Sequence, residues 1–143
     1  MYNGYSIVLD AGLMSDENAD SNLPNFDRLN VLIVEDEAII SFLIEDILRE
    51  LGCRVVRNVA CIEDALSALD EDRPDVAVLD VNLDGVEVYP VAERLRERGI
   101  PFVFTTGYGV DGLAPAWAHM PVVQKPFRSE MLARALEAVV LKP

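Results

Sequence analysis

The segment "LDVNLDG" around Asp80 contains residue types that bind cations. Asp80, Asn82, Asp84 and Gly85 match the first half of a calcium-binding loop. The match then fails, because the twelfth position, which should be a bidentate Glu, is Val91. The preceding "PDVAVLD" is a buried-strand pattern, whereas a helix leads into a calcium loop. The segment therefore predicts a strand that ends at Asp80, not a calcium-binding loop.

Polar residues also follow the other predicted strands. Glu35 and Asp36 come after "NVLIV", Thr105 and Thr106 end "PFVFTT", and Lys125 follows "PVVQ". Ligands of open parallel sheets bind at the carboxyl ends of the strands, so these side chains are expected to converge on one edge. Each has a simpler interpretation alone: Asp36 as a charge favouring a helix dipole, Lys125 as a solvated cation, the threonines as ordinary strand residues. Because all of these residues occur together, each at the end of a different predicted strand, a functional site is favoured over the separate interpretations.

The chemistry of such a site follows from its oxygen ligands and its lysine. Crowded carboxylates need a cation, and an all-oxygen set suits Mg²⁺. An Asp carboxylate can also form an acyl phosphate when nearby cations neutralise the phosphoryl oxygens. We therefore assign Asp80 as phosphoryl acceptor, Glu35 and Asp36 as metal ligands, and the backbone carbonyl of Asn82 as a further ligand. Lys125 and a Thr hydroxyl would neutralise the phosphate.

Five short apolar strands alternate with helical patterns from Leu29 onward. Because the strands are nearly all apolar, both faces of a parallel sheet are expected to be covered by helices. The predicted fold is α/β, a flavodoxin-like doubly wound sheet with strand order 2-1-3-4-5. In the first helix, the apolar positions expected to face the sheet are Ile40, Leu43, Ile44, Ile47 and Leu51.

One connection departs from this regular alternation. Between Thr106 and Pro121 the sequence is "GYGVDGLAPAWAHM", whose Gly and Pro content disfavours a sustained helix. We expect a short or disordered fourth helix. Within it, Trp117 and Met120, with Tyr108, either contact a partner or pack under their own loop; His119 is expected on the surface.

Composition limits the classes of function. The chain has 143 residues, of which 51% are hydrophobic, enough for one domain with a core. A net charge of -13 argues against direct nucleic-acid binding. No secretory signal or membrane-length apolar run is visible, which predicts a cytoplasmic protein without membrane contact. Cys53 and Cys61 lie in apolar contexts and are expected to be reduced.

The amino-terminal part of the chain differs from the rest. Residues 1–28 include the polar and acidic run "SDENADSNLPN", with "YSIVL" as their main apolar segment. We interpret them as an acidic extension, expected to be flexible, with docking as the alternative. The folded domain is expected to span residues 29–143.

The ordered set "VLIVEDE", "VAVLDVN", "FTTG" and "QKPF" resembles the receiver domain of two-component response regulators. The resemblance implies that Asp80 accepts a phosphoryl group from a histidine kinase or phosphotransfer protein. It also implies that Glu35 and Asp36 hold Mg²⁺, that Thr106 is a switch hydroxyl, and that Lys125 binds the phosphate. The peptide bond after Lys125 is cis in such domains.

The sequence departs from the family pattern in two informative places. Val122 occupies the usual aromatic switch position, and Asp84 replaces the usual proline after the acceptor. With "PFVFTTGYG", these changes resemble the stand-alone alphaproteobacterial receivers named for their FATGUY motif, in which the fourth helix is reduced. Thr105 stands where that motif has Ala, and Gly109 also departs from it.

The expected function is that of a single-domain response regulator, because no output domain follows the last helix. It would not be an enzyme, and would signal through its own protein-binding surface to a downstream protein or act as a phosphate sink. A degenerate receiver used only for protein interaction is the main alternative. A haloacid dehalogenase-like phosphatase needs a second Asp where Asn82 stands, and a flavodoxin would be repelled by "EDEA".

Overall fold

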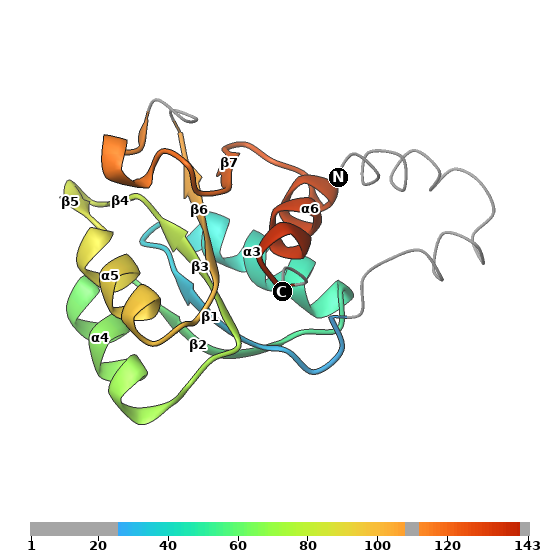
Figure 1. Cartoon of the computed structure of the whole chain (residues 1–143). Coiled ribbons are helices and arrows are strands. Elements are labelled where there is room, and N and C mark those ends of the chain that lie inside the picture. Colours follow the sequence, from blue (N-terminus) through green and yellow to red (C-terminus); the bar gives the residue numbers. More distant parts are fainter. Residues whose placement is uncertain (1–25, 108–111, 141–143) are drawn as a thin grey trace.

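The computed structural model describes residues 26–107 and 112–140, and its centre is a parallel sheet (Figure 1). The five strands are β1 (Asn30–Val34), β2 (Arg54–Val59), β3 (Val76–Asp80), β6 (Phe102–Thr106) and β7 (Val122–Gln124). Their order is β2-β1-β3-β6-β7, with every neighbouring pair parallel. This is the predicted flavodoxin-like order, in which the first strand lies next to both the second and the third.

Helices cover both faces of the sheet, as the apolar strands require (Figure 1). They are α3 (Ala38–Glu50), α4 (Ile62–Glu71), α5 (Tyr89–Glu97) and α6 (Ser129–Val140). Helices α4 and α5 lie on one face, and α3 and α6 lie on the other (Figure 1). The fold is therefore the predicted three-layer α/β sandwich.

Side-chain alternation along the strands divides the core into two layers. Leu79 and Phe104 pack with α4 and α5, whereas Val78 and Val103 pack on the α3 and α6 side. Because side chains of a strand alternate between faces, the layer of a strand-end residue follows from its position in the strand. This alternation fixes the direction of the polar residues at the strand ends.

The buried face of α3 differs in part from the expected one. Ile44 and Ile47 are buried as predicted, and so is Leu48, which the prediction left out. Leu43 is 39% exposed, so its assignment to the core was wrong, and Phe42 beside it is 68% exposed. The stripe that contacts the sheet is narrower than the run of apolar residues in this helix.

A small hairpin follows the end of β3. Strands β4 (Asn82–Leu83) and β5 (Val86–Glu87) pair antiparallel around a two-residue turn. Asp84 and Gly85 both have positive φ, 54° and 90°, which is the geometry of a type I′ turn and explains the Asp-Gly sequence. The side-chain oxygen of Asn82 accepts a hydrogen bond from the Gly85 amide at 2.6 Å. The segment that resembles half of a calcium-binding loop therefore forms this hairpin.

The connection between β6 and β7 contains the short 3-10 helix η2 (Pro115–Trp117). This confirms the expected short fourth helix for residues 112–120. Trp117 is buried and stacks on Tyr89 with ring centroids 5.9 Å apart, so it packs under its own loop. His119 is exposed as expected, and Tyr108 lies outside the described residues.

Phe26, the first residue that the structure describes, is buried in the core layer that also contains Val31. Residues 1–25, which make up most of the predicted extension, lie outside the described residues. Cys53 is buried and Cys61 is partly buried, and both are free thiols. Burial, assisted by the charge of Asp27, raises the pKa of Cys53 to about 11. Within the described ranges, no helix is long and apolar enough to cross a bilayer.

Candidate functional site

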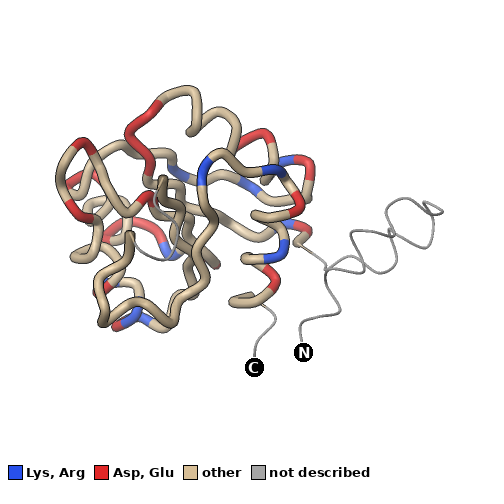
Figure 2. Tube along the Cα trace, turned by 90° about the horizontal axis from the view of Figure 1, so that it is seen from above, with Lys and Arg blue, Asp and Glu red and all other residues tan. Residues whose placement is uncertain are grey.

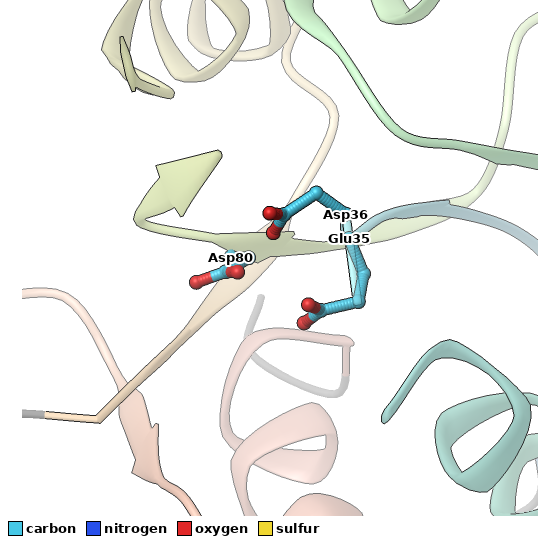
Figure 3. A group of neighbouring side chains, drawn as sticks. All are labelled: Glu35, Asp36 and Asp80. Atoms are coloured by element: carbon cyan, nitrogen blue, oxygen red, sulfur yellow. The ribbon is translucent and has the colours of Figure 1, made fainter. Parts of the chain in front are cut away.

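The three predicted acidic ligands lie together at the carboxyl edge of the sheet. Glu35 and Asp36 leave the end of β1, and Asp80 ends the neighbouring strand β3 (Figure 3). Each offers a carboxylate oxygen, and these oxygens lie within 4.8 Å of one another. Glu35 and Asp80 are buried, while Asp36 is only partly so. Because β1 and β3 are neighbouring strands, carboxylates that are far apart in the sequence form one cluster of oxygens.

Lys125 provides the positive charge at the centre of this cluster. Its Nζ lies 3.1 Å from Glu35 Oε1 and 3.1 Å from Asp80 Oδ2. The lysine follows β7 directly, and the peptide bond from Lys125 to Pro126 is cis, as the family resemblance implied. The chain therefore brings residues from the first, third and last strands of the sheet into one ion-pair network.

A fourth carboxylate, Glu37, also follows the first strand in the sequence but was given no role in the predicted site. Its Oε1 lies 3.4 Å from Lys125 Nζ, and its backbone amide donates a hydrogen bond to Glu35 Oε2 at 3.0 Å. Glu37 also begins α3, since its carbonyl accepts the Ser41 amide at 2.9 Å. The signal was present in the "EDEA" segment, where a third acidic residue directly follows the predicted pair.

The electrostatics of the site keep Asp80 partly protonated near neutral pH. The pKa of Asp80 is raised to about 7: burial is the largest cause, the charge of Glu35 also raises it, and Lys125 opposes both effects. Burial alone would lower the pKa of Lys125, but the attraction of Asp80 and Glu35 raises it above its usual value. The cluster is therefore short of positive charge, which favours the entry of a cation.

Asn82 and the two threonines occupy different positions around Asp80. The Asn82 amide donates to Asp80 Oδ1 at 3.2 Å, which places the Asn82 backbone beside the Asp80 carboxylate. Thr106 is buried at the end of β6, and its carbonyl accepts the Lys125 amide at 2.8 Å. Thr105 is completely buried and is paired in register with Asp80. All the predicted site residues thus lie around one strand edge.

The donor set fits a small hard cation. Three carboxylates with close oxygens suit Mg²⁺, which prefers a few carboxylate ligands and retains waters in its remaining positions. Asp36 is the most exposed of the three. Chemically, the arrangement combines a buried carboxylate with a lysine and a candidate metal site, and these are groups that phosphoryl transfer can use.

Several arginines outside this site pair with acidic side chains. Arg49, Arg57, Arg94, Arg96 and Arg98 each form an ion pair with an acidic side chain. In Figure 2, basic segments are interspersed with acidic ones along the tube.

Solved structures share this fold. The solution structure of SdrG from Sphingomonas melonis Fr1 has a TM-score of 0.73 and 41% identity, covering 80% of this chain and 98% of that one. The receiver domain of the sensor histidine kinase PA1611 from Pseudomonas aeruginosa PAO1 has a TM-score of 0.69 and 27% identity, covering 80% of this chain and 99% of that one. Its structure has a magnesium ion coordinated in the active-site cleft.

Sequence comparison points in the same direction. The positive alginate biosynthesis regulatory protein of Pseudomonas aeruginosa is 36% identical over 114 residues, which are 76% of this chain and 46% of that protein. The two-component response regulator PhoP of the same species is 36% identical over 119 residues, or 78% of this chain and 52% of that protein. This chain thus spans about half the length of these curated relatives. The profile of the response regulator receiver domain matches residues 31–137, and the chain belongs to this family.

Proposed function

We propose that this protein is a single-domain response regulator that accepts a phosphoryl group on Asp80 in a Mg²⁺-dependent reaction. The donor would be a histidine kinase or a histidine phosphotransfer protein. The observation that carries the proposal is the contact of Lys125 with both Asp80 and Glu35 at 3.1 Å, beside a cluster of carboxylate oxygens. Burying such charged groups costs free energy, and clusters of this kind are typical of functional sites, here one for phosphoryl transfer.

The proposed reaction assigns one role to each residue. An Asp80 oxygen attacks phosphorus, the bond from phosphorus to the donor's imidazole nitrogen breaks, and its electron pair returns to that nitrogen. Lys125 would move from the carboxylates to a phosphoryl oxygen. Glu35, Asp36, Asp80 and the Asn82 backbone carbonyl would hold Mg²⁺, which neutralises charge on the transferred group.

The readout of phosphorylation would be a change in the protein's own surface. Thr106 would act as the switch hydroxyl by turning toward the new phosphoryl oxygens. Val122, at the position of the usual aromatic switch, is half-buried and has no aromatic ring to rotate. We therefore propose that the transmitted change occurs in the loops after β6 and β7. The altered surface would contact a downstream protein, or the domain would serve as a phosphate sink.

The proposal also includes the organisation of the chain and its location. Residues 1–28 would form a separate acidic extension of a receiver domain that spans residues 29–143. The protein would work in the cytoplasm without direct contact with nucleic acid or membrane, and signalling rather than turnover of a substrate would be its purpose. The net charge of -13 supports the expectation for nucleic acid.

Intact mass spectrometry with a small phosphodonor tests this function. The wild-type protein and Asp80→Asn are incubated with acetyl phosphate, each with Mg²⁺ and with EDTA. We expect a phosphate adduct on the wild type with Mg²⁺ alone, because the nucleophile and the cation are both required. An equal adduct on Asp80→Asn would contradict the acceptor assignment. The absence of any adduct, from acetyl phosphate or a phosphoramidate, would instead favour a degenerate receiver that acts only as an interaction module.

A further inference from the structure

Thr105 carries a buried hydroxyl that the proposed function does not use. The residue is 0% exposed, and its Oγ1 has no hydrogen-bond partner among residues 26–107 and 112–140. Leaving a buried hydroxyl unpaired costs about 1–3 kcal/mol in proteins. Valine has nearly the same shape and would fill the same space without this cost. The hydroxyl therefore calls for an explanation other than packing.

The sheet register places Thr105 directly beside the phosphoacceptor. Asp80 on β3 is the Cα partner of Thr105 on β6, and Thr105 is in turn paired with Val123 on β7. Residues paired across adjacent strands have neighbouring side chains when both point to the same face. Thr105 is thus one strand away from the reacting carboxylate.

Strand alternation shows that the two side chains do share a face. Val78 and Val103 both belong to the core layer on the α3 and α6 side. Asp80 and Thr105 each lie two residues further along the same strands, so both point toward this layer. Lys125, two residues after Val123 of the same layer, reaches Asp80 Oδ2 at 3.1 Å from this side. Thr106 has the opposite parity, with Phe104.

The carboxylate of Asp80 has its two oxygens occupied in this structure. Lys125 donates to Oδ2, and the Asn82 amide donates to Oδ1. In the proposed reaction Lys125 leaves the carboxylate for a phosphoryl oxygen, so the carboxylate loses a donor. The hydroxyl of Thr105 is the neighbouring buried donor that is still available.

We infer that Thr105 is a second functional hydroxyl, which donates a hydrogen bond to the Asp80 carboxylate when phosphoryl transfer draws Lys125 away. This inference rests on the proposed function. Thr106 and Thr105 would then divide the work by face: Thr106 contacts the phosphoryl group, and Thr105 contacts the oxygen of the acyl group. This role would explain why Thr105 stands where the FATGUY motif has alanine, which has no hydroxyl.

The expected effect concerns the loss of phosphate from Asp80. In hydrolysis, water adds to phosphorus and releases a proton to the solvent, while the bond from phosphorus to the Asp80 oxygen breaks and its electron pair returns to the carboxylate. A donor to the acyl group becomes stronger as negative charge develops there, so it accelerates this step. Removing the hydroxyl should therefore prolong the life of the aspartyl phosphate.

Three substitutions isolate the hydroxyl. Thr105→Val keeps the shape and removes the donor, Thr105→Ser keeps the donor, and Val103→Ala disturbs the same core layer one pleat away from the site. The full-length proteins are phosphorylated with acetyl phosphate and Mg²⁺, exchanged into donor-free buffer with Mg²⁺, and followed by intact mass. We expect Thr105→Val to lose phosphate about three- to tenfold more slowly, the kinetic equivalent of one hydrogen bond. Thr105→Ser should remain close to the wild-type rate.

Thermal unfolding of the unphosphorylated proteins separates this role from a structural one. We expect Thr105→Val to melt at or above the wild-type temperature, because an unpaired hydroxyl is removed, and Val103→Ala to melt lower while losing phosphate at the wild-type rate. Equal rates of phosphate loss for the wild type and Thr105→Val would overturn the inference while leaving the acceptor role of Asp80 intact. A wild-type protein that forms no adduct would refute the proposed function itself.

Discussion

The acidic edge of the sheet and the aromatic cluster around Trp117 are both buried, yet they are held together in opposite ways. At the edge, Lys125 balances the buried carboxylates Glu35 and Asp80. In the cluster, Phe104 and Tyr89 surround Trp117 with ring centroids about 6.0 Å away. The edge is short of positive charge, whereas the cluster is a complete set of apolar contacts.

This difference shows which part of the molecule is expected to respond to its surroundings. The stability of the edge depends on pH and on cations, because protonation or a bound ion relieves the repulsion between carboxylates. The cluster depends on shape and apolar area, which neither pH nor Mg²⁺ changes. The loss of stability caused by a substitution should therefore depend on pH and Mg²⁺ at the edge but not in the cluster, and its size should also differ between the two regions.

The largest loss of stability is expected in the aromatic cluster. Phe104 is completely buried and packs edge-on against Tyr89, Phe102 and Trp117. Phe104→Ala should lower the free energy of unfolding by about 3–5 kcal/mol, because it leaves a cavity in this layer. Urea unfolding measures the loss. The same loss should be found with and without Mg²⁺, and a strong dependence on Mg²⁺ would erase the distinction between the regions.

A dependence of stability on pH is expected for the acidic edge without metal. The pKa of Asp80 is raised from 3.8 to about 7, first by burial and then by Glu35, so the native state keeps this proton to a higher pH than the unfolded chain. The stabilisation from this group is full below about pH 4 and is lost as pH rises through about 7. The loss is at most ~4 kcal/mol.

Unfolding in EDTA at several pH values checks this dependence. The difference in unfolding free energy between the wild type and Asp80→Asn removes the contributions of other titrating groups. We expect Asp80→Asn to gain stability relative to the wild type from pH 5 to pH 8, since the amide cannot ionise. A constant difference across this range would contradict the raised pKa.

A smaller loss is expected from Lys125→Met. The substitution leaves Glu35 and Asp80 without their cation, but the two carboxylates can relieve the repulsion by sharing a proton. We expect a loss of about 2–3 kcal/mol at neutral pH, less than for breaking a fully charged buried pair. Added Mg²⁺ should restore part of this loss, which it should not do for Phe104→Ala. Failure of Mg²⁺ to restore any stability would argue against a metal site here.

The smallest effect is expected at the rim of the aromatic cluster. The guanidinium of Arg96 lies 4.5 Å from the ring centroid of Trp117, on a half-exposed side chain that also pairs with Glu93. Arg96→Gln should cost about 0.5–1 kcal/mol and shift the fluorescence of Trp117, the single tryptophan of the chain. Glu93→Gln, which keeps the arginine, serves as the control. A shift of equal size in the control would assign the effect to the ion pair.

The sequence was most informative where residue type and strand position coincide. Glu35, Asp36, Asp80 and Lys125 are polar residues at the ends of apolar strands, and parallel strands end at one edge, so their convergence followed from the pattern. The short η2 followed from Gly and Pro content in the same way. In these places residue type and strand order together were enough to predict the observed structure.

The sequence was less informative where tertiary packing chooses between similar residues. In α3, Leu48 is buried and Leu43 is 39% exposed, although both are apolar and fit a helical face. The angle at which the helix crosses the sheet decides between them, and spacing alone does not specify it. The contact of Glu37 with Lys125 also depends on side-chain geometry at the start of α3. Trp117 could not be assigned to the core until Tyr89 was seen to stack on it.

The most direct test of the central claim is to locate the phosphoryl group within the chain. Borohydride reduces an aspartyl phosphate to homoserine, so the protein is phosphorylated with acetyl phosphate and Mg²⁺, reduced, digested and analysed by tandem mass spectrometry. The account predicts homoserine at Asp80 and nowhere else, and none when EDTA replaces Mg²⁺. Homoserine at Asp36 or another carboxylate, with Asp80 unchanged, would contradict it.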